Sequence, residues 1–209
     1  MQFQLQIASP GGILALNPAV INRMLETSER IKSSDPEAAF LVSWAALEGF
    51  LHRVLVVAIQ YQGLSAKDAV ELVSSLGIHR RASLERALGS VLGQPPSNLP
   101  RYGRDWRSLY AREQGSHRSY HERRHGLIHG SKHANPVILG KGVDAIVEMV
   151  RMPLFGLCEV SIHAGTQRGT SLLLGDVLTP YSGRLGSATG SATVQDVTEA
   201  YGWHLWRPT

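Results

Sequence analysis

The longest apolar stretch of the chain is residues 38–61, which read AAFLVSWAALEGFLHRVLVVAIQY. Its apolar positions fall on nearly every side of a helical wheel, which is typical of a helix at the centre of a bundle. The sequence DPE at 35–37 is a start signal for such a helix. Because Glu48, His52 and Arg53 would be expensive in the middle of a bilayer, the stretch predicts a buried helix and not a membrane span.

Shorter helices are expected before and after this central one. Asn17-Pro18 is typical of a helix start, and Ser65 with Asp68 resembles a capping pair. Three prolines in residues 94–100 exclude a continuous helix there, whereas Gly130 is a natural residue just past a helix end. The expected helices are 18 to about 33, 38–61, 65–76, about 84–92, about 104–115, 116–129 and 142 to about 163, the last kinked at Pro153.

Both ends of the chain differ from this helical middle. Residues 2–7 alternate polar and apolar, with Phe3, Leu5 and Ile7 on one face, which predicts a short edge strand. From Gly165 onward the composition shifts to Gly, Ser and Thr. We therefore expect a mainly α domain at 18–165, an N-terminal strand or extension at 1–17, and an irregular or partly β extension with an aromatic end at 166–209.

Composition places the chain among ordinary globular proteins. Its 209 residues, 43% hydrophobic and 18% charged, suffice for one compact domain with terminal extensions. The single cysteine, Cys158, excludes an internal disulfide and fits a reducing compartment. The first residues lack the pattern of a secretory signal, so we expect a cytoplasmic location.

Positive charge is concentrated in one segment. Between Arg101 and His133 there are eight Arg or Lys and three acidic residues, a net charge of +5, whereas the rest of the chain carries −1. Five of the nine histidines also lie in this segment. Such a concentration of cations and neutral-range titratable groups predicts an anionic partner.

The candidate catalytic residues are Arg124 and His129 in the sequence RHGLIHG at 124–130. The guanidinium of Arg124 matches the geometry of phosphate oxygens and can stabilise charge that develops on phosphorus. His129 lies near the expected end of a helix, where the helix dipole favours a cation, and an imidazole can serve as base or acid. Since RNA supplies its own 2′-hydroxyl nucleophile, such a pair needs neither metal nor cofactor to cleave a phosphodiester bond.

This segment resembles the R-x4-6-H motif of HEPN domains, in which a polar residue commonly follows the Arg; here it is His125. The central sequence AALEGFL at 45–51 is also similar to the early HEPN helix that carries a Leu-Glu pair. The resemblance frames residues 18–165 and implies a HEPN-like antiparallel helical bundle. It also implies a homodimer whose composite active site cuts single-stranded RNA to a 2′,3′-cyclic phosphate. Many HEPN proteins are toxins or defence effectors, so a nucleotidyltransferase-type antitoxin is an expected partner.

Further residues are candidates for supporting roles. His125 is expected to assist the catalytic pair, and Glu48, costly if unpaired in an apolar helix, is expected either in a buried ion pair or orienting Arg124 or His129. The predicted RNA-binding residues are Arg118, Tyr120, Arg123 and Lys132, although Tyr120 also suits a core or interface position. The stripe Tyr102, Trp106 and Tyr110 could stack on bases but more often such a stripe belongs to a core.

Two alternatives remain open from the sequence. The motif spacing is loose and is met four times, by Arg112 with His117, Arg118 with His125, and Arg123 or Arg124 with His129. A non-catalytic HEPN-like module that binds RNA, nucleotide or protein is therefore one alternative. The other is a metal-binding helical protein, since HERRH at 121–125 matches the HExxH pattern of zinc peptidases. Its two central arginines would repel a bound dication.

Overall fold

The structure is a computed structural model. It describes residues 6–9, 12–15, 19–61, 64–92, 95–98, 102–111, 118–130, 134–151, 161–164, 170–173 and 192–203. Within these ranges the chain is mainly helical, which confirms the predicted helical bundle.

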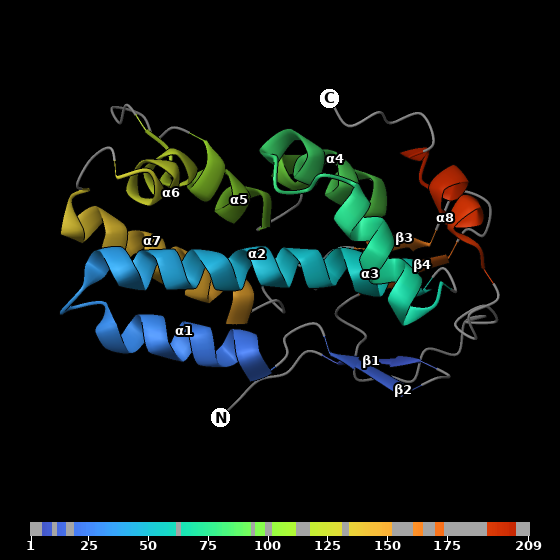
Figure 1. The fold of residues 1–209 in the computed structure, drawn as a ribbon, viewed down its shortest axis with the longest axis horizontal. Coiled ribbons are helices and arrows are strands. Elements are labelled where there is room, and N and C mark those ends of the chain that lie inside the picture. The colour runs from blue at the N-terminus through green and yellow to red at the C-terminus, as the bar shows by residue number, and fades with distance from the viewer. Residues whose placement is uncertain are drawn as a thin grey trace.

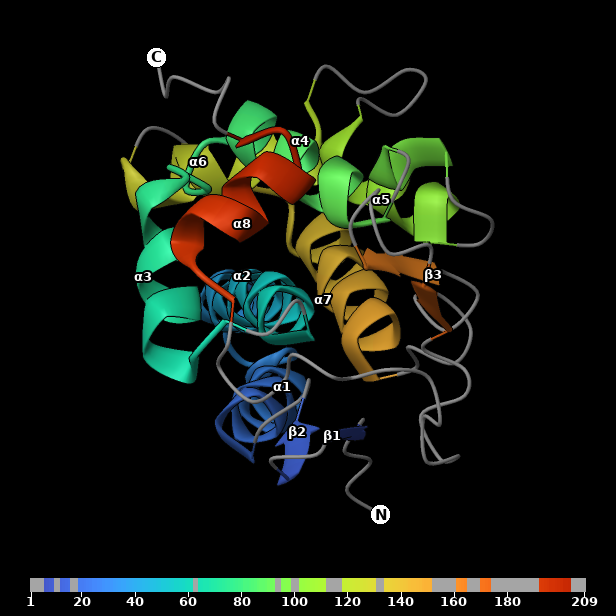
Figure 2. The same ribbon diagram turned by 90° about the vertical axis from the view of Figure 1, so that its right-hand side faces the viewer.

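Helix α2 (Pro36–Tyr61) is the central element, as its apolar sequence predicted. Figure 1 shows it running through the molecule, with α1 (Ala19–Ile31) along one side. In Figure 2 the view is nearly along α2, and α7 (Pro136–Arg151) lies beside it. By length and composition alone, Pro36–Val56 could also cross a membrane, but 61% of its most apolar window is buried inside the bundle. That burial is the expected property of a core helix.

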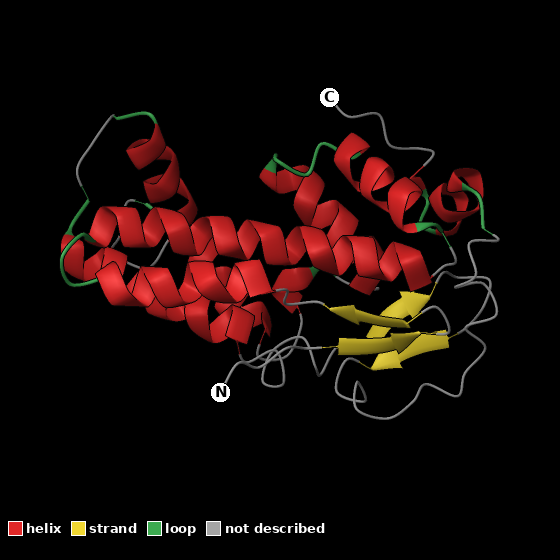
Figure 3. Cartoon of the chain, turned by 60° about the horizontal axis from the view of Figure 1, so that its bottom comes forward, coloured by secondary structure: helices red, strands yellow, loops and turns green. Residues whose placement is uncertain are grey.

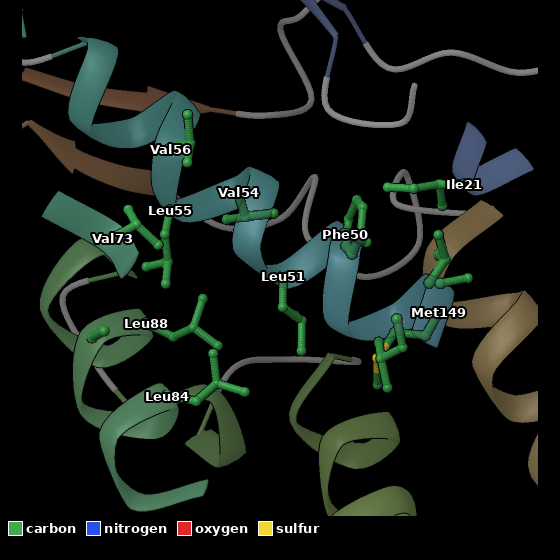
Figure 4. Close-up of a cluster of buried hydrophobic side chains, with 14 of the residues drawn as sticks. Ile21, Phe50, Leu51, Val54, Leu55, Val56, Val73, Leu84, Leu88 and Met149 are labelled. Carbon is green, nitrogen blue, oxygen red and sulfur yellow. The ribbon is translucent and has the colours of Figure 1, made fainter. Parts of the chain in front are cut away.

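Four shorter helices complete the bundle around α2. They are α3 (Ala66–Ser75), α4 (Arg81–Leu92), α5 (Tyr102–Tyr110) and α6 (Tyr120–Ile128), with a short 3-10 turn at Pro96–Asn98. Figure 4 shows Leu55 of α2 gathered with Val73 of α3 and Leu88 of α4, all of them fully buried. The predicted cap of α3 is confirmed, because the Ser65 side chain accepts a hydrogen bond from the Asp68 backbone N–H.

The ends of the chain contain two short hairpins and one more helix. Strand β1 (Gln6–Ser9) pairs antiparallel with β2 (Gly12–Ala15), and β3 (Ser161–Ala164) pairs antiparallel with β4 (Thr170–Leu173). Helix α8 (Val194–Ala200) follows. Both hairpins lie toward the end of the molecule away from α6 (Figures 1 and 3). The predicted strand at 2–7 overlaps β1 only at residues 6 and 7, since residues 2–5 lie outside the described ranges.

The predicted helix from 142 to about 163 was wrong at both ends. It begins at Pro136, because the Asn135 side chain accepts a hydrogen bond from the Val137 backbone N–H at 2.9 Å. Asn135 is therefore the cap and Pro136 the first residue of the helix. The described helix reaches Arg151, residues 152–160 lie outside the described ranges, and residues 161–164 form β3 where the end of the helix was predicted.

Gly142 permits the close approach of three helices. A Cβ at this position of α7 would lie 2.8 Å from Phe40 Cε2 of α2 and 2.8 Å from Tyr120 Cδ1 of α6. Both rings are buried, with Phe40 0% and Tyr120 6% exposed. The absence of a side chain at Gly142 therefore sets how closely the start of α6 packs on the bundle.

We predict that Gly142→Ala destabilises the protein by about 1–3 kcal/mol, because an overpacked core must displace a buried ring. Gly140→Ala is the matched control in the same helix, since its Cβ would meet only Lys32 Cδ at 3.9 Å. There the better helix propensity of alanine should raise stability by up to about 1 kcal/mol. Chemical denaturation of both variants measures the difference, and equal shifts would contradict this role for Gly142.

Candidate functional site

Helix α6, which carries the RHGLIHG sequence, is capped at both ends. The Ser119 side chain accepts a hydrogen bond from the Glu122 backbone N–H at 3.2 Å, and Glu122 Oε2 accepts one from the Ser119 backbone N–H at 2.8 Å. This capping box fixes the start of the helix. At the other end His129 is the last residue with near-helical geometry, and Gly130 follows with φ +63°. The predicted helix stop at Gly130 is confirmed.

Arg124 is held by a carboxylate of the central helix. Its Nη2 lies 3.1 Å from Glu48 Oε1 and 3.2 Å from Oε2, and Trp44 Nε1 donates to Glu48 Oε1 at 3.1 Å. The partner expected for Glu48 is therefore present, but the expected burial of the pair was wrong. The side chains of Arg124 and Glu48 are 28% and 45% exposed, so the ion pair adds little to the stability of the fold. Its main effect is to fix the position of the guanidinium.

His125 and His129 form a pair of exposed imidazoles at the end of α6. Their ring centroids are 4.3 Å apart, with an interplanar angle of 60°. Residues five apart on a helix differ in direction by about 140°, so Arg124 and His129 do not share one face of α6. Arg124 faces α2, whereas His129 lies at the exposed end of the helix.

His121 points into the bundle instead of joining that pair. Its ring centroid lies 6.0 Å from Trp44 of α2 and 5.6 Å from Tyr110 of α5. Burial lowers the pKa of His121, and the nearby positive charges of Arg81 and Arg124 lower it further. Burial is also the main reason that the pKa of Tyr110 is raised, with a further contribution from Glu48.

The alternative zinc site at 121–125 does not fit this arrangement. The His121 ring rests on Trp44 and Tyr110, the Glu122 carboxylate is engaged in the capping box, and the His125 ring lies against His129. Across the ranges that the structure describes, no group of three or more His, Cys, Asp or Glu residues could hold a metal ion. The His121, Glu122 and His125 side chains of the HExxH match therefore contact different neighbours and do not converge on one point.

The predicted RNA-binding residues have different environments. Arg118, two residues before the start of α6, and Arg123, in the middle of α6, are half-buried, and Lys132 lies outside the described residues. Tyr120 is a correction: its ring packs on Phe40 at 6.0 Å between centroids and is only 6% exposed, so it belongs to the core.

Two residues of the predicted aromatic stripe on α5, Trp106 and Tyr110, also belong to the core, whereas the side chain of Tyr102 lies outside the described part of the chain. Trp106 is 1% and Tyr110 3% exposed, and their rings stack with centroids 4.3 Å apart. This is the structural alternative that the sequence left open. Two buried rings cannot also serve as a stacking platform for bases, so any base contact must come from other residues.

The sequence did not indicate that Arg81 of α4 contacts Tyr110, whose ring lies against His121 of α6. Its Nη1 donates to the Tyr110 backbone carbonyl at 2.8 Å, and its guanidinium lies 5.5 Å from the centroid of the Tyr110 ring. Its Nε also pairs with Glu85 at 2.9 Å. The i, i+4 spacing of Arg81 and Glu85 was the available signal, but nothing in the sequence indicated the contact with α5.

The lowered pKa of His121 makes the stability of the protein depend on pH. Because the pKa of His121 in the folded protein lies below the ordinary value of a histidine, about 6.5, the unfolded chain binds this proton more readily. The stabilisation is therefore complete above about pH 6.5 and is lost as pH falls through the folded pKa. We predict that the melting temperature falls between about pH 7 and pH 5, and that His121→Gln reduces this fall.

His79→Gln is the control for that measurement, because His79 is exposed in the turn before α4. His52 contributes a change in the same direction, since burial and Arg53 lower its pKa. The fall should therefore shrink without vanishing in His121→Gln. An unchanged pH dependence in that variant would contradict the assignment.

No family model, curated protein or solved structure matches this chain. The resemblance to HEPN domains therefore stands on the RHGLIHG sequence of α6 and the Leu-Glu pair of α2.

Proposed function

We propose that the chain is a cytoplasmic, metal-independent endoribonuclease of the HEPN type that cuts single-stranded RNA. One observation carries the proposal most strongly. Glu48 of α2 fixes the guanidinium of Arg124, while the same short helix ends in the exposed pair His125 and His129. A held cation and accessible imidazoles are the groups that phosphodiester transfer requires.

In the proposed reaction His129 accepts the proton of the ribose 2′-hydroxyl. The 2′-oxygen then forms a bond to phosphorus, and the bond from phosphorus to the 5′-oxygen breaks. A second imidazole, the His129 of a second copy, gives its proton to that 5′-oxygen. The products are a 2′,3′-cyclic phosphate and a free 5′-hydroxyl, and no water or metal enters the step.

Arg124 stabilises the charge on the phosphate oxygens during this step. The described contacts of Arg124 with Glu48 involve Nη2, so the N–H groups of Nε and Nη1 can still face a phosphate. Orientation by Glu48 reduces the freedom that the guanidinium would otherwise lose on binding RNA. His125, against His129, supports the orientation of that ring.

A homodimer would complete the site. Arg124 and His129 lie on different sides of α6, so a cleft lined by both residues calls for a second copy. Two large apolar side chains are exposed where α6 ends and α7 begins: Ile128 is 50% and Val137 67% exposed. Apolar surface beside the catalytic segment suits a two-fold contact. The roles as toxin or defence effector, and an antitoxin partner, follow from the family resemblance alone.

We predict that the purified protein cleaves single-stranded RNA in excess chelator and that Arg124→Ala and His129→Ala each lower the rate by at least about a hundredfold. Gel analysis of an end-labelled oligonucleotide, with identification of the 2′,3′-cyclic end, measures both claims. Arg30→Ala and His79→Ala remove the same residue types from exposed positions elsewhere and should cleave normally. Full cleavage by either site variant would reject its assigned role.

We also predict that Ile128→Glu with Val137→Glu shifts the protein from dimer to monomer and lowers cleavage with it, because a buried carboxylate at the contact lacks a partner. Light scattering after size-exclusion chromatography gives the mass. Val20→Glu is the matched control, since Val20 is 53% exposed on α1. A wild-type protein that cleaves RNA as a monomer would overturn the composite site.

A further inference from the structure

Charge is divided unevenly between two parts of the described chain. We define the arginine layer as the described residues from Arg80 to Gly130, which include α4, α5 and α6. It holds eight arginines and three acidic residues, a net charge of +5. The other described residues hold seven basic and eleven acidic residues, a net charge of −4. The described chain therefore has one distinctly cationic part, which runs from α4 to α6.

The three helices of this layer lie on one side of α2. Figures 1 and 2 both show α4, α5 and α6 above the central helix, with α1 on the opposite side. Contacts join them directly: Arg81 of α4 binds the Tyr110 carbonyl of α5, and the Tyr110 ring lies against His121 of α6. The helices that carry these arginines thus pack beside the helix that carries the RHGLIHG segment.

The chemistry of the layer favours a phosphate-rich partner. All eight of its basic residues are arginine, whereas three of the seven basic residues in the rest of the described chain are lysine. Arginine binds phosphate oxygens through two parallel N–H donors, which lysine cannot do. Three exposed arginines lie outside the proposed catalytic residues: Arg80 in the turn between α3 and α4, Arg86 on α4 and Arg104 on α5.

We propose that RNA held at α6 continues across α4 and α5, where Arg80, Arg86 and Arg104 contact its phosphates. This extension rests on the proposed function, because it names the part of the substrate that lies beyond the scissile bond. It makes the chain selective for RNA long enough to reach from α6 to α4. Phosphate contacts of this kind position a strand without reading its sequence.

The test uses His129→Ala protein, which keeps RNA intact, and compares two triple variants of equal charge change. One is Arg80→Gln, Arg86→Gln and Arg104→Gln; the other is Arg23→Gln, Lys67→Gln and Lys141→Gln, all exposed and outside the layer. Fluorescence anisotropy measures binding of RNAs of about 20 and about 4 nucleotides. The first variant should bind the long RNA at least about tenfold more weakly. The slope of its log binding constant against log salt concentration should also be less steep, by up to about two.

The short RNA should bind both triple variants alike, and the control variant should bind the long RNA within about twofold of the parent. Equal losses in the two variants would show a response to net charge only and would overturn the proposal, as would no loss in the first. An acidic peptide that binds as tightly, with the same dependence on Arg80, Arg86 and Arg104, would also overturn it.

The outcome is separable from that of the proposed function. Loss of long-RNA binding in the first variant, together with no cleavage by wild-type protein, would reject the nuclease and retain the RNA path. Cleavage by wild-type protein, with unchanged cleavage of long RNA when the three arginines are replaced in it, would retain the nuclease and reject the path. Thermal melting confirms that both triple variants are folded before either comparison.

Discussion

The packing of other helices around α2 is the constraint on which the rest of the structure depends. Leu47, Leu51 and Leu55 of this helix are completely buried, and one continuous apolar cluster reaches from them into every neighbouring helix. Shorter helices such as α5 and α6 have nine residues each, too few to be stable alone. Their positions, and therefore the positions of Arg124 and His129, are set by the apolar surfaces that they share with α2 and with one another.

The same helix also supplies the polar contact that orients the candidate site. Trp44 and Glu48 are one helical turn apart, and the indole N–H of Trp44 donates to the carboxylate that pairs with Arg124. The Trp44 ring is 1% exposed and fixed by the core. A rigid side chain thus holds a partly exposed one, which in turn holds the guanidinium. Two polar contacts, from Trp44 to Glu48 and from Glu48 to Arg124, thus connect the rigid core to a partly exposed guanidinium.

Sequence patterns predicted the parts of this architecture that depend on local chemistry. The central helix follows from its apolar run, and the ends of α3 and α6 follow from Ser65 and Gly130. The predictions that were wrong concern features that local sequence does not determine. Asn135-Pro136 can end one segment or begin another, and only the packing of α7 on α2 selects the second. Likewise, Tyr120 on a basic helix has the composition of an RNA contact, but the gap left by Gly142 gives its ring a place in the core.

The candidate site was predictable in part for the same reason. A carboxylate in an apolar helix requires a partner, so a contact with Glu48 could be expected, whereas the partial exposure of the pair depends on the packing of α6 on α2, which local sequence does not specify. The pairing of His125 with His129 follows from a spacing of four residues. The contact of Arg81 with Tyr110 joins residues 29 positions apart and had no local signal.

The arginines that favour a phosphate partner also explain the state of His121. An imidazolium between Trp44 and Tyr110 would lose hydration and be repelled by Arg81 and Arg124, so the neutral ring is the form that packs there. His125 and His129 avoid this constraint because they lie at the exposed end of the helix. One helix thus separates its histidines by environment: the first serves as a packing residue, and the last two remain accessible for proton transfer. That division follows from where α6 leaves the bundle, and it is the physical reason to assign the chemistry to His129 and not to His121.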